Sequence, residues 1–138
     1  MNKLRLNLGC GQKLIDDPEW LNVDSRKIIP DTAIFLRHDI RALKGNVVQE
    51  GRVAEILADD VLEHFSLPEA RQLLADCYAM LEPGGLFTIK TPEIGLLTEW
   101  ANTHDAEKTA FRWYGGNDYP ENCHRFCWPQ AMLITELK

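Results

Sequence analysis

The first 24 residues constrain the fold more than any other part of the chain. The apolar segment Leu4–Leu8 runs into the turn Gly9-Cys10-Gly11, and a second apolar segment, Trp20–Asp24, ends in a carboxylate. Short apolar runs bounded by turn residues are typical of buried strands. Glycine lets the backbone approach a ligand where a Cβ would collide, and a carboxylate in this place can accept two hydrogen bonds from a ribose diol. The pattern predicts a nucleotide pocket at one edge of a sheet.

The spacing of these residues narrows the ligand. A dinucleotide fingerprint has three glycines and an acidic residue about 20 positions further on. Here Leu14 stands at the third glycine position, and Asp24 follows Gly9 by only 15 residues. Residues 12–19 leave room for a turn or two of helix, whereas a pyrophosphate favours a full helix N-terminus. A nucleoside cofactor without phosphates, such as S-adenosylmethionine, fits better, although the glycine pair alone is equally compatible with a plain tight turn.

Composition limits the class of protein. The 138 residues correspond to one domain, residues 1–138, and the net charge of −6 argues against a general nucleic-acid binder. A negative chain suits a cationic ligand such as a sulfonium better. We expect no membrane segment, because no apolar run has the length of a span, and the N-terminus has no signal-peptide pattern. Four scattered cysteines without an export signal indicate reduced thiols in a cytoplasmic protein.

One cysteine pair could suggest a metal site. Cys123 and Cys127 have a spacing that occurs among zinc ligands, but a second pair is missing, and His104 is the nearby extra candidate. Two small thiols in the protein interior explain the pair better. We therefore predict no metal site from these residues.

Strand and helix signals alternate along the chain, which predicts an α/β fold: a Rossmann-like, doubly wound, mostly parallel sheet of about five strands. The expected strands are Leu4–Leu8, Trp20–Asp24, Ala33–Arg37, Val53–Ala58 and Leu86–Lys90. The expected helices are Leu67–Leu81, Ile94–Ala101, Ala106–Tyr114 and Gln130–Leu137. The first helix has the clearest signals, because Ser66 and Glu69 stand in the capping-box relation and Pro83-Gly84-Gly85 would end it.

Polar residues follow the third and fourth strands, where ligands bind in doubly wound sheets. Asp39 can accept a hydrogen bond from an adenine amino group and Ile40 can cover the ring, although an aspartate that starts a turn is common. The segment Asp59–Phe65 holds three carboxylates and His64. Such a cluster normally faces water or a cation. His64 is a candidate general base, and a structural histidine that caps the turn is equally compatible with its position.

The last third of the chain is rich in aromatic residues and contains a glycine-rich segment that ends in Cys123-His124-Arg125. Glycines would permit movement, aromatic side chains would exclude water, and His124 and Arg125 could contact an acceptor. Aromatic packing against the sheet edge explains any single one of these aromatic residues somewhat better.

Taken in order, Leu-Asn-Leu-Gly-Cys-Gly, Val-Asp, His-Asp-Ile, Asp-Val-Leu-Glu-His-Phe and Leu-Glu-Pro-Gly-Gly resemble the motifs of class I S-adenosylmethionine-dependent methyltransferases of the small-molecule type. The resemblance is strong over residues 4–91. It implies that the glycine turn holds the methionine part of the cofactor, Asp24 the ribose, and Asp39 with Ile40 the adenine. It also implies that the segment after the fourth strand lines the cofactor and that His64 faces a small-molecule acceptor. The implied cofactor-binding residues are Leu8, Gly9, Cys10, Gly11, Asp24, Asp39, Ile40, Asp59, Asp60, Val61 and Leu62, and the implied catalytic residues are His64 and His124.

The chain departs from the family pattern in two places. The connection between the first two strands is short, so one flank of the pocket should be open or built from a loop. The family's sheet ends with two further strands, the last antiparallel, and we find no segment for them in the 48 residues after Lys90. The fifth strand would then be an exposed edge, which predicts a homo-oligomer or poor solubility.

Two other functions compete with methyl transfer as interpretations of this sequence. A non-catalytic, methyltransferase-like binding module stays open, since the missing strands favour it and the intact cofactor motifs favour the enzyme. A nicotinamide oxidoreductase is disfavoured by Leu14, by the short first connection and by the carboxylate cluster.

Overall fold

The computed structural model describes residues 3–103 and 105–138, so His104 lies outside the described residues. These residues divide into two compact units. The sheet unit comprises the residues up to Asp59 together with Gln72–Lys90, and the second unit comprises Asp60–Arg71 and Thr91–Lys138.

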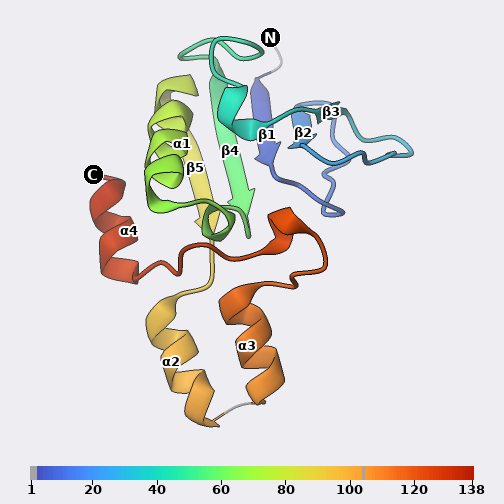
Figure 1. The fold of residues 1–138 in the computed structure, drawn as a ribbon. Coiled ribbons are helices and arrows are strands. Elements are labelled where there is room, and N and C mark those ends of the chain that lie inside the picture. Colours follow the sequence, from blue (N-terminus) through green and yellow to red (C-terminus); the bar gives the residue numbers. More distant parts are fainter. Residues whose placement is uncertain (1–2, 104) are drawn as a thin grey trace. The chain divides into compact units, whose positions relative to one another are not determined.

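The sheet unit is built on five strands in the order β3-β2-β1-β4-β5 (Figure 1). All neighbouring pairs are parallel, which confirms the predicted Rossmann-like α/β fold. The strand order reverses between β1 and β4, and such a switch point is where ligands bind in open parallel sheets. The strands are β1 (Leu4–Leu8), β2 (Trp20–Asp24), β3 (Phe35–Arg37), β4 (Val53–Asp59) and β5 (Leu81–Lys90).

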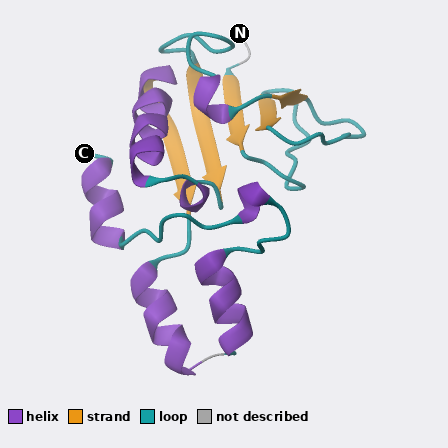
Figure 2. Cartoon of the chain, viewed as in Figure 1, coloured by secondary structure: helices purple, strands orange, loops and turns teal. Residues whose placement is uncertain are grey.

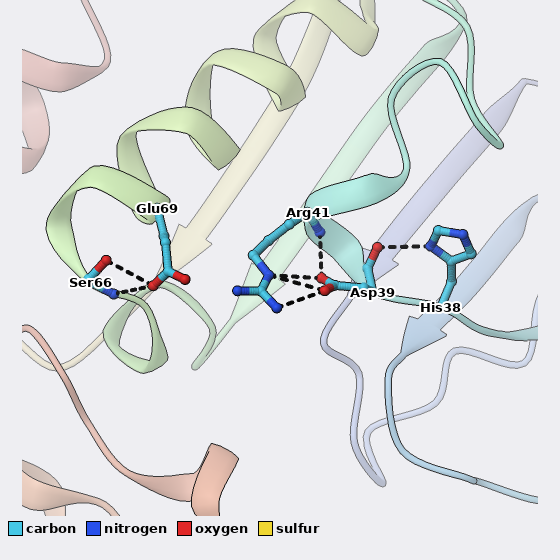
Figure 3. A network of polar contacts seen from close by, with 5 residues as sticks. All are labelled: His38, Asp39, Arg41, Ser66 and Glu69. Atoms are coloured by element: carbon cyan, nitrogen blue, oxygen red, sulfur yellow. Dashed lines mark hydrogen bonds and ion pairs between the residues drawn. The ribbon is translucent and has the colours of Figure 1, made fainter.

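The helix α1 (Leu67–Met80) begins where the sequence predicts. Figure 3 shows the capping contact: the Ser66 backbone N–H and hydroxyl donate to Oε2 of Glu69 at 3.0 and 2.8 Å. Of the residues whose helical spacing predicts the apolar face, Ala70, Leu73, Leu74 and Cys77 are buried, whereas Tyr78 is 81% exposed.

The junction between α1 and β5 differs from the prediction. Leu81, expected in the helix, is the first residue of β5 and pairs with Val53, and the next pair joins Leu86 to Glu55. The predicted turn Pro83-Gly84-Gly85 therefore lies within β5 as a bulge. The physical reason is that Pro83 has no N–H for the ladder and Gly84 adopts a positive φ of 82°.

No helix connects β1 to β2: the structure describes all of residues 9–19, and they form turns and loop. Two buried asparagines hold this loop. Asn22 accepts from Ile15 N–H and donates to Ile15 C=O at 2.8 and 2.9 Å, and Asn7 donates to Asn22 Oδ1 and to Lys13 C=O, both at 2.8 Å. The side-chain amides of Asn7 and Asn22 thus form hydrogen bonds with backbone groups of the loop, which in a helix would bond to one another. The connection between β1 and β2 is therefore a loop, and its role as a flank of the cofactor pocket stays a prediction.

The second unit holds the remaining helices (Figure 2). Helices α2 (Ile94–Thr103) and α3 (Ala106–Tyr114) contact each other, and the chain continues through the 3₁₀ turn η3 (Pro120–Asn122) to α4 (Gln130–Glu136). A further 3₁₀ turn, η2 (Leu62–His64), precedes α1. Trp128 is 1% exposed and packs edge-on against Phe126.

Strand β5 is an outer strand of the sheet, as predicted, and its Leu86 side chain is half exposed. Pairing of this edge with another chain stays a prediction. Within the described residues, no helix combines the length and the apolar character that crossing a membrane requires.

Candidate cofactor and acceptor sites

The glycine turn meets Asp24 at the carboxyl end of β1. Leu8 pairs with Val23, the Cys10 N–H donates to the Val23 carbonyl, and the Gly11 N–H donates to Oδ2 of Asp24 at 2.9 Å. Gly9 and Gly11 have φ values of 57° and 51°, a conformation that favours glycine. The sequence therefore brings the turn and the carboxylate together, as predicted, beside the end of β4 at the switch point.

The Arg26 side chain occupies the space next to this contact. Its Nε donates to Oδ1 of Asp24 at 3.3 Å, and the Arg26 N–H donates to the same oxygen at 2.8 Å. A Cβ added to Gly11 would lie 2.9 Å from the Arg26 guanidinium. Arg26 is partly exposed, so a ligand that needs this space can displace it at a cost of about 1 kcal/mol or less.

Asp59, at the end of β4, is held by cations of the chain itself. Its Oδ1 lies 3.2 Å from Lys13 Nζ, which comes from the loop after β1, and 3.6 Å from Lys90 Nζ at the end of β5. We expect the carboxylates after β4 to face water or a cation, and at Asp59 the cations are Lys13 and Lys90.

Asp39 forms the N-cap of the 3₁₀ turn η1 (Ile40–Ala42), where it accepts from the Arg41 N–H at 2.9 Å (Figure 3). The Arg41 guanidinium also binds the carboxylate, with an Nη2–Oδ2 distance of 2.7 Å, and this hydrogen bond lowers the pKa of Asp39. In this structure Asp39 therefore starts a turn, which is the alternative to its predicted adenine role. Ile40 is buried.

Several other predicted cofactor residues have buried side chains, so they would offer backbone or a small surface to a ligand: Leu8, Cys10, Val61 and Leu62. Burial raises the pKa of the Cys10 thiol to about 11, and the nearby Asp24 charge adds to the shift. Cys10 is therefore an inert thiol near neutral pH. Asp60 has a φ of 56°, uncommon outside glycine and tolerated best by Asp and Asn.

The two predicted catalytic histidines meet in the second unit. The rings of His64 and His124 lie edge-on with centroids 4.9 Å apart. They meet because the carbonyl of Glu63 accepts from the backbone N–H groups of Arg125 and Phe126, which joins η2 to the segment after η3. Both histidines line an open pocket of about 770 Å³, whose wall also includes Asp60, Glu63, Trp100, Lys108, Phe111 and Arg112.

The surroundings lower the pKa of both imidazoles. For His64 the largest cause is burial, followed by the neighbouring His124, with backbone oxygens of Cys123 and Glu121 acting in the opposite direction. For His124 burial is again the largest cause, offset in part by its hydrogen bond to the Arg112 carbonyl. Both shifts favour the neutral imidazole, which is the form that can accept a proton.

Comparison with solved structures decides the fold family. A S-adenosylmethionine-dependent methyltransferase from Archaeoglobus fulgidus matches 98% of this chain with a TM-score of 0.66 and 15% identity. A Haloferax volcanii protein solved in complex with the Trm112 methyltransferase activator matches 99% with a TM-score of 0.62 and 14% identity. The Burkholderia thailandensis 1,6-didemethyltoxoflavin N1-methyltransferase, solved with S-adenosylhomocysteine, matches 65% with a TM-score of 0.50 and 22% identity. This chain has the class I methyltransferase fold.

The chain spans 58%, 59% and 45% of these three proteins, respectively. No family model and no curated protein sequence matches it. At identities this low, the comparison establishes the methyltransferase fold and leaves ligand and reaction to the residues of this chain.

Three residues around the glycine turn of this methyltransferase fold are not among those predicted from the sequence. Asn7 and Asn22 hold the loop that carries the glycine turn, and Arg26 covers it. A polar residue at an otherwise apolar position of each of the first two strands was the available signal. Nothing in the sequence indicates that Arg26 folds back onto Asp24.

Proposed function

We propose that this chain binds S-adenosylmethionine at the carboxyl end of β1 and β2 and transfers its methyl group to a small-molecule acceptor. The observation that carries the proposal is the contact of Gly11 N–H with Asp24, at the switch point of a sheet with the methyltransferase fold. A nucleoside needs no phosphate anchor, and the loop between β1 and β2 provides no helix N-terminus for one.

In this proposal, Asp24 binds the ribose hydroxyl groups and the backbone of Gly9-Cys10-Gly11 contacts the methionine part. Asp39 and Ile40 lie after β3, where they would contact adenine, and Asp59–Leu62 would line the cofactor. A buried carboxylate that already accepts backbone N–H groups has a fixed orientation, which suits recognition of a diol.

The pocket of the second unit would hold the acceptor. Trp100 and Phe111 offer flat apolar surface. The lowered pKa of His64 and of His124 favours the neutral imidazole, which can take a proton from an acceptor hydroxyl or amine. The methyl group moves from the sulfonium by in-line displacement, so positioning supplies much of the rate. Pairing of β5 with a second copy is part of the proposal as a prediction only.

Two measurements test the proposed function. We expect isothermal titration calorimetry to show binding of S-adenosylhomocysteine but not of NAD, and labelled S-adenosylmethionine to transfer its methyl group to a compound in the small-molecule fraction of a cell extract. Binding without any transfer would favour the non-catalytic binding module. Absence of binding would refute the proposal.

The Arg26→Ala variant should bind S-adenosylhomocysteine up to about tenfold more tightly, because the side chain that covers Gly11 and pairs with Asp24 no longer has to be displaced. Calorimetry on both proteins gives the comparison. Arg52→Ala, at an exposed arginine before β4, is the matched control and should leave the affinity unchanged. Weaker binding by Arg26→Ala would show that Arg26 contacts the cofactor instead.

A further inference from the structure

We infer that Glu63, His64 and His124 form a site for a divalent transition-metal ion in the second unit. Each side chain offers one ligand atom, and the three atoms all lie within 4.8 Å of one another. In a tetrahedral zinc site with ligand distances near 2.1 Å, ligand atoms are about 3.4 Å apart. Side-chain adjustments of about 1 Å would therefore bring the three atoms into coordination distance.

Two of the three proposed ligands are oriented by a neighbouring group, as metal ligands usually are. His124 Nδ1 lies 2.8 Å from the Arg112 carbonyl, which can only accept, so Nδ1 carries the proton and Nε2 presents a lone pair. Oε2 of Glu63 accepts from the Thr91 hydroxyl at 2.9 Å.

Burial provides the second argument. Glu63 is 1% exposed, so the carboxylate of this proposed ligand lies away from bulk water. Nδ1 of His64 is buried, and no hydrogen bond to it is found among the residues that the structure describes. A buried polar atom of this kind calls for an explanation, and a cation at the centre of the three side chains would give His64 Nδ1 a partner.

The donor set indicates the kind of ion. Two imidazoles and one carboxylate are typical of zinc and of non-haem iron sites, whereas magnesium and calcium prefer oxygen ligands alone. Sites with three protein ligands keep a position open for substrate or water. This position would face the pocket that the same residues line. The cysteines do not take part: Cys123 and Cys127 donate to the carbonyls of His124 and Trp113.

If the proposed function holds, the ion also identifies the acceptor class. A hydroxyl group bound at the open position would lose its proton more readily. The ion would thus replace the imidazoles, which would accept this proton in a site without a metal. This part of the inference rests on the proposed function, and it favours a methyl acceptor that has a hydroxyl group to bind the ion. The metal site itself does not depend on it.

The test is a titration of chelator-treated protein with Co²⁺, followed by visible absorption, with Zn²⁺ as competitor. We expect one ion per chain, ligand-field bands that Zn²⁺ abolishes, and at least a tenfold loss of affinity in Glu63→Gln and in His124→Gln. His38→Gln, at a histidine of the sheet unit, and the Cys123→Ser/Cys127→Ser double variant should bind as the wild type does.

Absence of stoichiometric binding by the wild-type chain would overturn the inference, whatever the variants do. Loss of binding only in the cysteine double variant would also overturn it, because it would move the site to the thiols. Circular dichroism shows whether Glu63→Gln remains folded, and His124→Gln, at a partly exposed residue, provides the second variant. None of these readings needs S-adenosylmethionine, so failure of the metal site and failure of the proposed function give different results.

Discussion

Replacing Asp24 with alanine is expected to lower the affinity for S-adenosylhomocysteine by about 100-fold or more. The carboxylate is the charged acceptor that the proposed site offers to the two ribose hydroxyl groups, and hydrogen bonds to charged groups contribute about 1.5–3 kcal/mol each. The variant also frees the Gly11 N–H, which now donates to Oδ2 of Asp24, and so loosens the glycine turn. Isothermal titration calorimetry of the folded variant measures the loss.

Two further variants separate recognition from structure. Asp31→Ala changes an exposed aspartate of the sheet unit and should bind as the wild type does. Asp24→Asn keeps the shape and one acceptor oxygen but removes the charge, so we expect an intermediate affinity. Unchanged binding by Asp24→Ala would refute the ribose role, since no rearrangement of Arg26 can supply an acceptor.

The order and type of the elements could be predicted from the sequence because the local signals agree with the fold. β1 and β2 have the predicted bounds, and so does α3. Apolar runs bounded by glycine, proline and aspartate indicate buried strands in any context, and the Ser66–Glu69 contact is a purely local interaction.

The errors arose where tertiary contacts determine the backbone. Helical spacing extends through Leu81, but pairing with Val53 draws this residue into β5. β3 is shorter than predicted because its pairing with β2 covers only Phe35–Arg37. Propensity is a weak guide at such boundaries, since the partner strand supplies the hydrogen bonds that decide them.

In the candidate sites, too, contacts between residues close in sequence could be predicted and long-range contacts could not. The glycine turn and Asp24 are close in sequence and meet through one strand pair, so their spacing predicts their contact. His64 and His124 are 60 residues apart. The two rings lie close together because the backbone N–H groups of Arg125 and Phe126 donate to the Glu63 carbonyl. No sequence pattern predicts these hydrogen bonds. Each histidine could be chosen as a candidate on chemical grounds, but their pairing with each other and with Glu63 required the structure.

The Asn22→Ala variant should be the most strongly destabilised of those described, with a loss of about 3 kcal/mol in the free energy of unfolding. Asn22 is 0% exposed and uses its whole amide: it accepts from Asn7 and Ile15 and donates to the carbonyls of Ile15 and Ile34 at 2.8–2.9 Å. Alanine leaves these buried groups without partners, and each such group costs about 1–3 kcal/mol.

Urea denaturation of both proteins measures the difference, and Asn46→Ala is the matched control. Asn46 is exposed and its amide donates one hydrogen bond, to the Ala42 carbonyl, so its loss should cost about 0.5 kcal/mol or less. Because the Asn7–Asn22 pair holds the loop that follows the glycine turn, Asn22→Ala should also weaken S-adenosylhomocysteine binding at temperatures where the chain is still folded. Equal stability of the two variants would show that the loop does not depend on the asparagine pair.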